Sequence, residues 1–191
     1  MVNIGESKEL LGELLYQWAA NHPDDGLNDI NTYAGLFRRL ALECKHITEF
    51  GVRNGISTGG FLSGLPDRHV CYDIDKRPNM KMLENIAGLA GVKFEFKQAD
   101  TTSLPSIEPT DLLFVDACHR YSHVSKELVH AKSVRKYIVF HDTTECWERE
   151  NGNPVYIEGI GRAIQELLAK GEWFISSHYT KGSGLMILAR K

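Results

Sequence analysis

Three side chains able to bind a metal ion follow two apolar segments of this sequence. The segment DLLFVD ends at Asp116, and the segment KYIVFH ends at His141, which is followed directly by Asp142. Near-continuous apolar runs of this length are typical of buried parallel strands, and the carboxyl ends of such strands meet at one edge of a sheet. We therefore expect Asp116, His141 and Asp142 to lie close together.

The side-chain types of this group indicate its chemistry. Two carboxylates suit Mg²⁺, which keeps several waters and binds through one or two carboxylates together with substrate oxygens. The imidazole of His141 is a softer ligand, and it favours a softer divalent ion or no metal at all. A structural interpretation stays open beside the metal site, because acids at strand ends also cap helices and accept loop hydrogen bonds.

A glycine-rich turn lies earlier in the chain, between a short β-prone run at 47–50 and a helix start. The turn contains Gly51 and Gly55. Glycine accepts positive φ and lets the backbone approach a ligand closely. Free N–H groups at the helix start, with the hydroxyl of Ser57 or Thr58, can hold a carboxylate or phosphate. The turn is therefore a candidate anion site, with a purely structural turn as the alternative.

An acid completes this pattern at the end of the next predicted strand. Asp73 lies in the run VCYDID at 70–75, and acids about 20 residues beyond such turns commonly bind a ribose diol. The glycine turn and Asp73 together indicate a nucleotide-type cofactor. A dehydrogenase is one alternative, but its G-x-G-x-x-G spacing requires a third glycine that this turn lacks.

Hydrophobic periodicity predicts the elements that position these residues. Strands are expected at 47–50, 70–75, 92–97, 111–116 and 136–141, followed by a hairpin of strands at 172–179 and 185–190. Helices are expected at 79–90, around 124–131 and at 158–170. The first 45 residues carry two further helices, which either pack on the core or cover the pocket or an oligomer interface; core packing is favoured. Alternating strands and helices indicate a parallel α/β sheet.

Composition limits the class of protein. The chain has 191 residues, 42% of them hydrophobic and 25% charged, which suits one globular domain spanning 1–191. A net charge of −3 without a long Lys/Arg run argues against a nucleic-acid partner. The four cysteines show no C-x-x-C spacing, so neither a zinc site nor a disulfide framework is expected. No segment has membrane-spanning length, and we expect a cytoplasmic protein without a membrane partner.

The turn and the strand order resemble those of class I S-adenosylmethionine (SAM) methyltransferases. Glu49, Gly51 and Gly55 match the family's E/D-x-G-x-x-x-G motif. The resemblance covers the chain from residue 47 to its end. It implies a Rossmann-like α/β fold, with a seven-stranded, mostly parallel sheet, an antiparallel last strand and helices on both faces. The segments DLLFVDACHRYSHVSKEL and YIVFHDTT further resemble the group of sugar and macrolide O-methyltransferases and cephalosporin-hydroxylase-like proteins.

The resemblance also implies which residues contact the cofactor. Glu49, the glycine turn and Ser57 would serve its aminoacyl end. Asp100, with Thr101 beside it, matches the family position that contacts the adenine amino group. An aspartate at a strand end is also a common helix cap, so that interpretation of Asp100 stays open.

The same resemblance assigns the catalytic residues. His119 lies in a D-x-x-H segment with Asp116, where the family places a general base, and an imidazole suits that task because its pKa lies near working pH. The family's acidic pair after strand five is Glu-Asp, whereas this chain has His141 and Asp142. A histidine that only hydrogen bonds the loop is the alternative for His119.

The sequence therefore predicts a SAM-dependent O-methyltransferase that acts on a small hydroxylated molecule, such as a sugar, polyketide or catechol, with or without Mg²⁺ or another divalent metal. A SAM-binding protein without transferase activity and an oxidoreductase are the alternatives. The loops at 23–31 and 143–156 are expected to shape the acceptor pocket. Assembly into a homo-oligomer stays open.

Overall fold

The computed structural model describes residues 4–22, 29–148 and 159–191. The chain divides into two compact units, Met1–Gln98 and Ala99–Lys191. Each unit carries one group of predicted site residues, and the expectation of a single domain stays a prediction.

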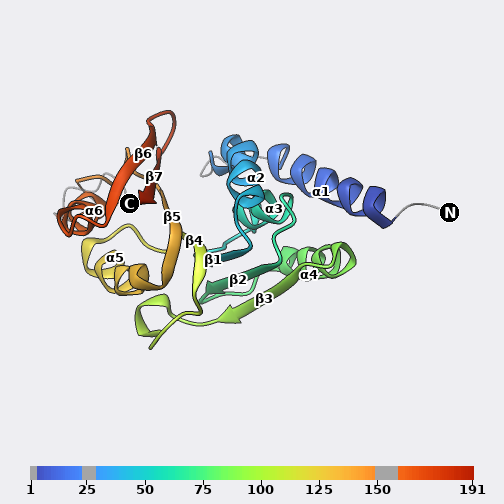
Figure 1. Ribbon diagram of the computed structural model, residues 1–191, viewed down its shortest axis with the longest axis horizontal. Coiled ribbons are helices and arrows are strands. Elements are labelled where there is room, and N and C mark those ends of the chain that lie inside the picture. Colours follow the sequence, from blue (N-terminus) through green and yellow to red (C-terminus); the bar gives the residue numbers. More distant parts are fainter. Residues whose placement is uncertain (1–3, 23–28, 149–158) are drawn as a thin grey trace. The chain divides into compact units, whose positions relative to one another are not determined.

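The first unit contains three parallel strands with helices packed on them. Its strands are β1 (His46–Phe50), β2 (Arg68–Asp73) and β3 (Lys93–Gln98), and its helices are α1 (Ile4–Ala20), the 3₁₀ helix η1 (Ile30–Tyr33), α2 (Ala34–Leu42), α3 (Ile56–Leu62) and α4 (Asn79–Ala90) (Figure 1). Strand β2 pairs in parallel with β1 and with β3. Helix α1 packs against α2, α3 and α4.

Helix α1 packs on the core of this unit, as favoured from the sequence. Leu15 is buried in a cluster that includes Leu62 of α3 and Leu83 of α4. Leu10 and Leu14 of the same helix are exposed. A 3.6-residue repeat places these two leucines beyond the width of the buried face.

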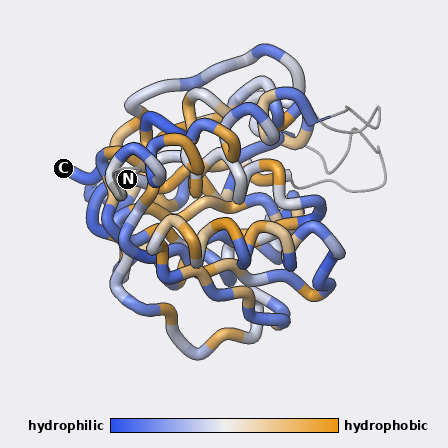
Figure 2. The backbone as a smooth tube through the Cα atoms, turned by 90° about the vertical axis from the view of Figure 1, so that its right-hand side faces the viewer, coloured by the Kyte–Doolittle hydropathy of each residue, from blue (hydrophilic) through white to orange (hydrophobic). Residues whose placement is uncertain are grey.

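Helix α4 begins and ends where the sequence predicts, but not all of its large apolar side chains lie on its buried face. It buries Met80, Leu83, Ala87 and Ala90, whereas Leu89 is exposed. The small side chains of Ala87 and Ala90 let the helix pack closely on its neighbours. An apolar pattern in the sequence does not show whether an alanine or a leucine faces the core. Figure 2 shows hydrophilic and hydrophobic residues alternating along the helices, as amphipathic helices require.

The second unit contains four strands and the elements that connect them. Its strands are β4 (Thr110–Val115), β5 (Val134–His141), β6 (Trp173–Tyr179) and β7 (Leu185–Arg190); its helices are α5 (Tyr121–Glu127), α6 (Ile160–Ala169) and the 3₁₀ helices η2 (Thr101–Ser103) and η3 (Leu128–Ser133). Strands β4 and β5 are parallel, and β7 is antiparallel to both β5 and β6. The predicted hairpin is confirmed, and the helix expected around 124–131 is α5 followed by η3.

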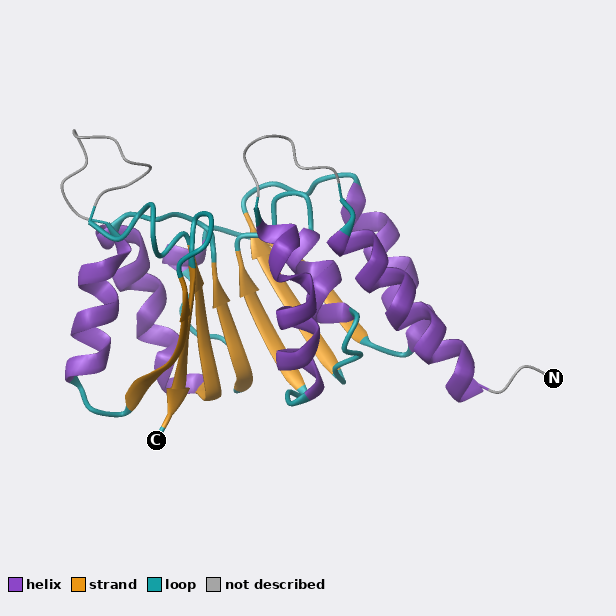
Figure 3. Cartoon of the chain, turned by 90° about the horizontal axis from the view of Figure 1, so that it is seen from above, coloured by secondary structure: helices purple, strands orange, loops and turns teal. Residues whose placement is uncertain are grey.

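The strand order identifies the fold class. It is β3-β2-β1-β4-β5-β7-β6, with β7 as the antiparallel strand. The cartoon in Figure 3 shows the strands with the helices packed beside them. The prediction of a Rossmann-like, mostly parallel seven-stranded sheet is therefore confirmed. Within the described part of the chain, no helix is both long and apolar enough to cross a membrane.

Candidate active site

The glycine turn connects β1 to α3 and needs glycine for two reasons. Gly51 and Gly55 have φ of 83° and 78°, a region that side chains disfavour. A Cβ atom on Gly55 would also overlap the side chains of Met80 and Leu83 in α4. The close approach inferred from the sequence is thus made, in this structure, by a neighbouring helix.

Asp73 ties the end of β2 to this turn. Its Oδ2 accepts hydrogen bonds from the backbone N–H groups of Val52 at 2.7 Å and Arg53 at 3.0 Å. Its Oδ1 accepts another from the N–H of Asp75 at 3.0 Å. The acid therefore orders the turn by itself, and its predicted contact with a ribose stays a prediction.

Glu49 and Ser57 meet beneath the turn instead of facing outward. Glu49 has no exposed surface and Ser57 is buried. The Ser57 hydroxyl donates to Glu49 Oε1 at 2.5 Å, and the Thr58 hydroxyl donates to Oε2 at 2.8 Å. Both hydroxyls predicted as ligand contacts are thus engaged by the Glu49 carboxylate. The assignment of Glu49 and Ser57 to the aminoacyl end stays a prediction.

Asp100 and Thr101 open the second unit. Asp100 caps η2 by accepting hydrogen bonds at Oδ1 from the N–H and hydroxyl of Thr102, and these bonds lower the pKa of Asp100. The Thr101 hydroxyl donates to Glu127 Oε1 at 2.6 Å and lies 3.1 Å from His123 Nε2. Asp100 thus acts as a helix cap, which was the alternative role considered for it. Its contact with adenine stays a prediction.

Glu127 is a buried acid beside Thr101 that sequence reasoning missed. It is fully buried, and its Oε2 has no hydrogen-bond partner among the described residues. His123 and Glu127 lie four residues apart on α5, with His123 Nε2 3.2 Å from Glu127 Oε1. This i, i+4 pairing was the available signal, since such residues share a helix face.

The four residues predicted for catalysis and metal binding form one cluster, which we call the acid–histidine cluster: Asp116, His119, His141 and Asp142. His119 Nε2 lies 2.9 Å from Asp142 Oδ2 and 3.3 Å from Asp116 Oδ1. His141 Nδ1 lies 3.3 Å from each of the same two oxygens. The ends of β4 and β5 therefore bring the predicted residues together.

Opposite charges set the proton affinities in this cluster. Burial by itself would lower the pKa of His119, but hydrogen bonds to Asp116 and Asp142 raise it far above its ordinary value. Burial would likewise raise the pKa of Asp142, but hydrogen bonds from His119 and His141 hold it well below its ordinary value. These contacts favour the protonated form of His119 and the ionised form of Asp142.

Backbone strain marks Asp142. Its φ of 57° lies in the left-handed region, which costs a residue with a side chain about 1–3 kcal/mol. The strained position follows directly on the last residue of β5 and aims the carboxylate at His119. Strain of this kind persists only where the surroundings hold the residue in place.

The donor set of the acid–histidine cluster fits a divalent ion. One ligand atom from each of Asp116, His141 and Asp142 lies within 4.8 Å of the others, and each side chain exposes at most 20% of its surface. Two carboxylates and one imidazole suit Mg²⁺ less well than a borderline ion such as Mn²⁺ or Zn²⁺. The predicted acceptor loops lie largely outside the described residues, which include only 29–31 and 143–148 of them.

Comparison with known proteins bears on both units. A model of the "Methyltransferase domain" family matches residues 48–143. The fold is similar to that of an O-methyltransferase from Bacillus cereus in complex with SAH, with a TM-score of 0.64 and 20% identity over 97% of this chain and 91% of that one. It is also similar to the O-methyltransferase TomG from Streptomyces achromogenes, involved in tomaymycin synthesis and in complex with SAM, with a TM-score of 0.63 and 19% identity over 95% and 89% of the two chains.

A third similar structure is an N-methyltransferase. NodS from Bradyrhizobium japonicum, in complex with S-adenosyl-L-homocysteine, has a TM-score of 0.60 and 14% identity over 94% of this chain and 98% of that one. Comparison with curated proteins gave no match. At these identities the structural likenesses show the fold, and the family match carries the assignment of the chain.

Proposed function

This chain belongs to the methyltransferase domain family, and from that premise we propose that it transfers the methyl group of SAM to a hydroxyl oxygen of a small molecule. The observation that carries the proposal is His119 lying between Asp116 and Asp142. An imidazole among carboxylates at strand ends provides a proton acceptor where an open parallel sheet binds its ligands. The family assignment leaves no ground for the dehydrogenase alternative.

Methyl transfer asks two things of the protein. SAM supplies an activated methyl group, so the chain has to align the acceptor oxygen with the sulfonium and remove the hydroxyl proton. The glycine turn with Asp73 is proposed to hold the cofactor. His119 is proposed to receive the proton, and Asp116 and Asp142 would hold its ring in place.

His119 must lose its own proton before it can act as a base. In the metal-free cluster its raised pKa keeps it protonated. A divalent ion held by Asp116, His141 and Asp142 would supply Lewis acidity that lowers the pKa of an acceptor hydroxyl. Engaging the two carboxylates would also weaken their hold on the His119 proton, so metal binding and base function are expected to depend on each other.

Two of the similar structures support an oxygen acceptor, since the Bacillus cereus protein and TomG are O-methyltransferases. NodS supports the alternative of an amine acceptor. Sugars, polyketides and catechols remain the proposed acceptor classes, because vicinal hydroxyls can bind a metal ion through two oxygens.

The test is turnover with defined acceptors. Purified protein is incubated with SAM, Mg²⁺ or Mn²⁺, and a panel of sugar, polyketide and catechol hydroxyls with matched amines, and formation of S-adenosylhomocysteine is followed by chromatography. Hydroxyl acceptors are expected to turn over. Exhaustive chelation should suppress the rate, and added metal should restore it.

Matched variants test whether the acid–histidine cluster binds the metal. Asp142→Asn should reduce turnover and metal binding while SAM affinity stays within about twofold, because Asp142 is proposed to bind the metal and not the cofactor. Asp75→Asn, at an exposed acid near the first-unit turn, serves as the control with unchanged turnover. SAM binding without turnover of any acceptor would favour a binding protein, and turnover of amines alone would contradict the oxygen acceptor.

A further inference from the structure

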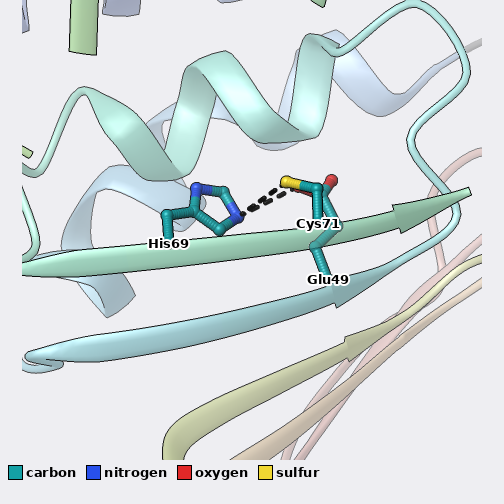
Figure 4. Close-up of side chains that lie close together, drawn as sticks. All are labelled: Glu49, His69 and Cys71. Carbon is teal, nitrogen blue, oxygen red and sulfur yellow. Dashed lines mark hydrogen bonds and ion pairs between the residues drawn. The ribbon is translucent and has the colours of Figure 1, made fainter. Parts of the chain in front are cut away.

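A second cluster of metal-ligating side chains lies inside the first unit, and we propose that it is a structural Zn²⁺ site made by Glu49, His69 and Cys71. Residues 69 and 71 alternate on β2, so their side chains point to the same face. Glu49 lies directly opposite Cys71 in the β1–β2 register. Figure 4 shows the three side chains directed toward one another from the two neighbouring strands.

The distances between the ligand atoms match a tetrahedral zinc ion. His69 Nε2 lies 3.1 Å from Glu49 Oε2, Cys71 Sγ lies 3.2 Å from the same oxygen, and the sulfur lies 3.5 Å from the nitrogen. Atoms with these separations lie about 1.9 Å from their common centre, close to the roughly 2.0 Å of Zn–N and Zn–O bonds. An ion that lies out of the ligand plane and is shifted away from the sulfur reaches the longer Zn–S bond of about 2.3 Å and keeps the two shorter bonds near 2.0 Å.

The surroundings of the three ligands are closed and dry. None of their side chains exposes any surface. The His69 ring packs edge-on against Phe61 and Phe94, with ring centroids 5.9 and 5.7 Å away. A closed ligand set without a position open to solvent is typical of structural zinc sites, whereas catalytic sites keep one position open.

Charge balance favours an ion in this interior. A buried carboxylate is costly unless it is paired. Zn²⁺ with the carboxylate of Glu49, the thiolate of Cys71 and neutral His69 carries no net charge. Burial and the nearby Glu49 raise the pKa of the metal-free thiol, so zinc binding would release a proton from Cys71, as is usual for cysteine ligands.

Helix α3 supplies the remaining polar groups around the cluster. The Thr58 hydroxyl contacts Glu49 Oε2 and also hydrogen bonds Cys71, so it offers a fourth oxygen on the side of the helix. Ser57 donates to the other oxygen of Glu49 and would hold the carboxylate in the orientation that binds the ion. Two strands and one helix would thus meet at the ion.

This inference departs from the expectation that the cysteines form no zinc site. That expectation rested on the missing C-x-x-C spacing, but a set of mixed ligands on two paired strands needs only one cysteine. The inference does not rest on the proposed acceptor or on the acid–histidine cluster. It does reassign Glu49, which would bind zinc and not the aminoacyl end of the cofactor.

Metal content tests the proposal. The chain carrying Asp116→Asn and Asp142→Asn, which remove the carboxylate ligands of the acid–histidine cluster, is expressed in zinc-supplemented medium, dialysed against a weak chelator and measured by plasma mass spectrometry, with the expected result of about one zinc per chain. Adding Cys71→Ser or His69→Asn to this chain should reduce the zinc content at least tenfold. Adding Cys44→Ser, at another buried cysteine, is the control and should keep the zinc.

Cobalt substitution gives a readout on the wild-type protein, so it does not depend on whether a variant folds. Wild-type protein produced with Co²⁺ in place of Zn²⁺ should show a thiolate-to-cobalt charge-transfer absorption, which requires the Cys71 sulfur as a ligand. Folded wild-type protein without bound zinc and without this absorption would overturn the proposal and leave a hydrogen-bonded network only. Zinc that is retained when Cys71→Ser is added to the folded Asp116→Asn and Asp142→Asn chain would overturn it as well.

Discussion

Asp73 orders the glycine turn, and we propose that it also binds the cofactor. It already accepts hydrogen bonds from Val52 and Arg53, and a ribose would add two more. We expect Asp73→Ala to weaken SAM binding by about 1–3 kcal/mol, because a buried hydrogen bond to a charged group is lost and the turn loses its anchor. Isothermal titration calorimetry measures the change.

The control for this variant lies two residues away. Asp75 is exposed and pairs with Arg77, so Asp75→Ala is expected to leave SAM affinity within about twofold, as surface ion pairs contribute little. Equal affinity of the wild type and Asp73→Ala would refute the cofactor role of Asp73.

Gly55 is expected to contribute to the stability of the fold as well as to cofactor binding. Gly55→Ala places a side chain at positive φ and pushes it against Met80 and Leu83, so the free energy of unfolding should fall by about 1–3 kcal/mol. Urea denaturation measures it. Gly88→Ala is the matched control, because nothing lies near the added methyl and a helical alanine is favoured over glycine; an equal loss in both variants would contradict the packing argument.

The catalytic prediction for a single residue concerns His119. His119→Ala should lower kcat by roughly 10²–10⁴-fold with little change in SAM affinity, because a general base acts in the transition state and not in cofactor binding. Single-turnover assays with an acceptor that the wild type converts measure the effect. His22→Ala, whose ring packs on Trp18, should keep the wild-type rate, and a near-normal rate for His119→Ala would transfer the base role to another group.

At the scale of elements, the strands were more predictable than the helix faces. The buried strands β4 and β5 are long apolar runs whose ends fix Asp116 and His141, so their site residues could be located from the sequence. The buried face of α4 could not, because its alanines carry little hydropathy signal and their close approach depends on the partner helix. The end of α5 could not be predicted either. The helix and the tighter η3 that follows it share one apolar pattern, so the sequence does not mark the change between them.

The prediction at the scale of elements concerns how much the packing of α2 on α3 stabilises the fold. Phe37 and Phe61 are fully buried, and their ring centroids are 4.7 Å apart. Phe37→Ala should reduce the free energy of unfolding by about 3–5 kcal/mol, through lost burial and the cavity left behind. Chemical denaturation measures the loss, with Phe174→Ala on the exposed side of β6 as a control that should cost less than about 1 kcal/mol.

At the scale of the whole molecule, the acid–histidine cluster should make stability depend on pH on two sides. The pKa of His119 is raised in the folded protein, so its contribution is fully present below about pH 6.5 and is lost as the pH rises toward the folded value. The pKa of Asp142 is lowered, so its contribution is present above about pH 3.9 and is lost as the pH falls.

Urea denaturation of the metal-free protein between pH 6 and pH 9 measures the alkaline side. The His119 proton should contribute a decline of at most about 1.4 kcal/mol per pH unit, and His119→Asn should flatten the curve by that amount. Parallel curves for the two proteins would show that His119 does not hold an excess proton in the folded state.

The sequence also left part of the candidate site unpredicted. Asp116, His141 and Asp142 were expected to lie close together because each lies at or next to a strand end, and the edge of a parallel sheet is a shared location, whereas His119 was assigned by the resemblance to the family. The buried partners His69, Cys71 and Glu127 were not found, because their roles depend on which side chains face each other across strands or along a helix face. Pairing register and helix rotation fix those contacts, and local patterns do not encode either one reliably.

The bonding around Glu49 has a consequence for how the first unit opens. Because one carboxylate joins β1 to β2 and to the start of α3, the glycine turn cannot loosen as an isolated surface loop does. It should open only together with both strands, as part of one cooperative unit. The backbone amides of the turn that face the interior should therefore exchange their hydrogens as slowly as those of the strands, and the cofactor would meet a turn that is already in place when it arrives.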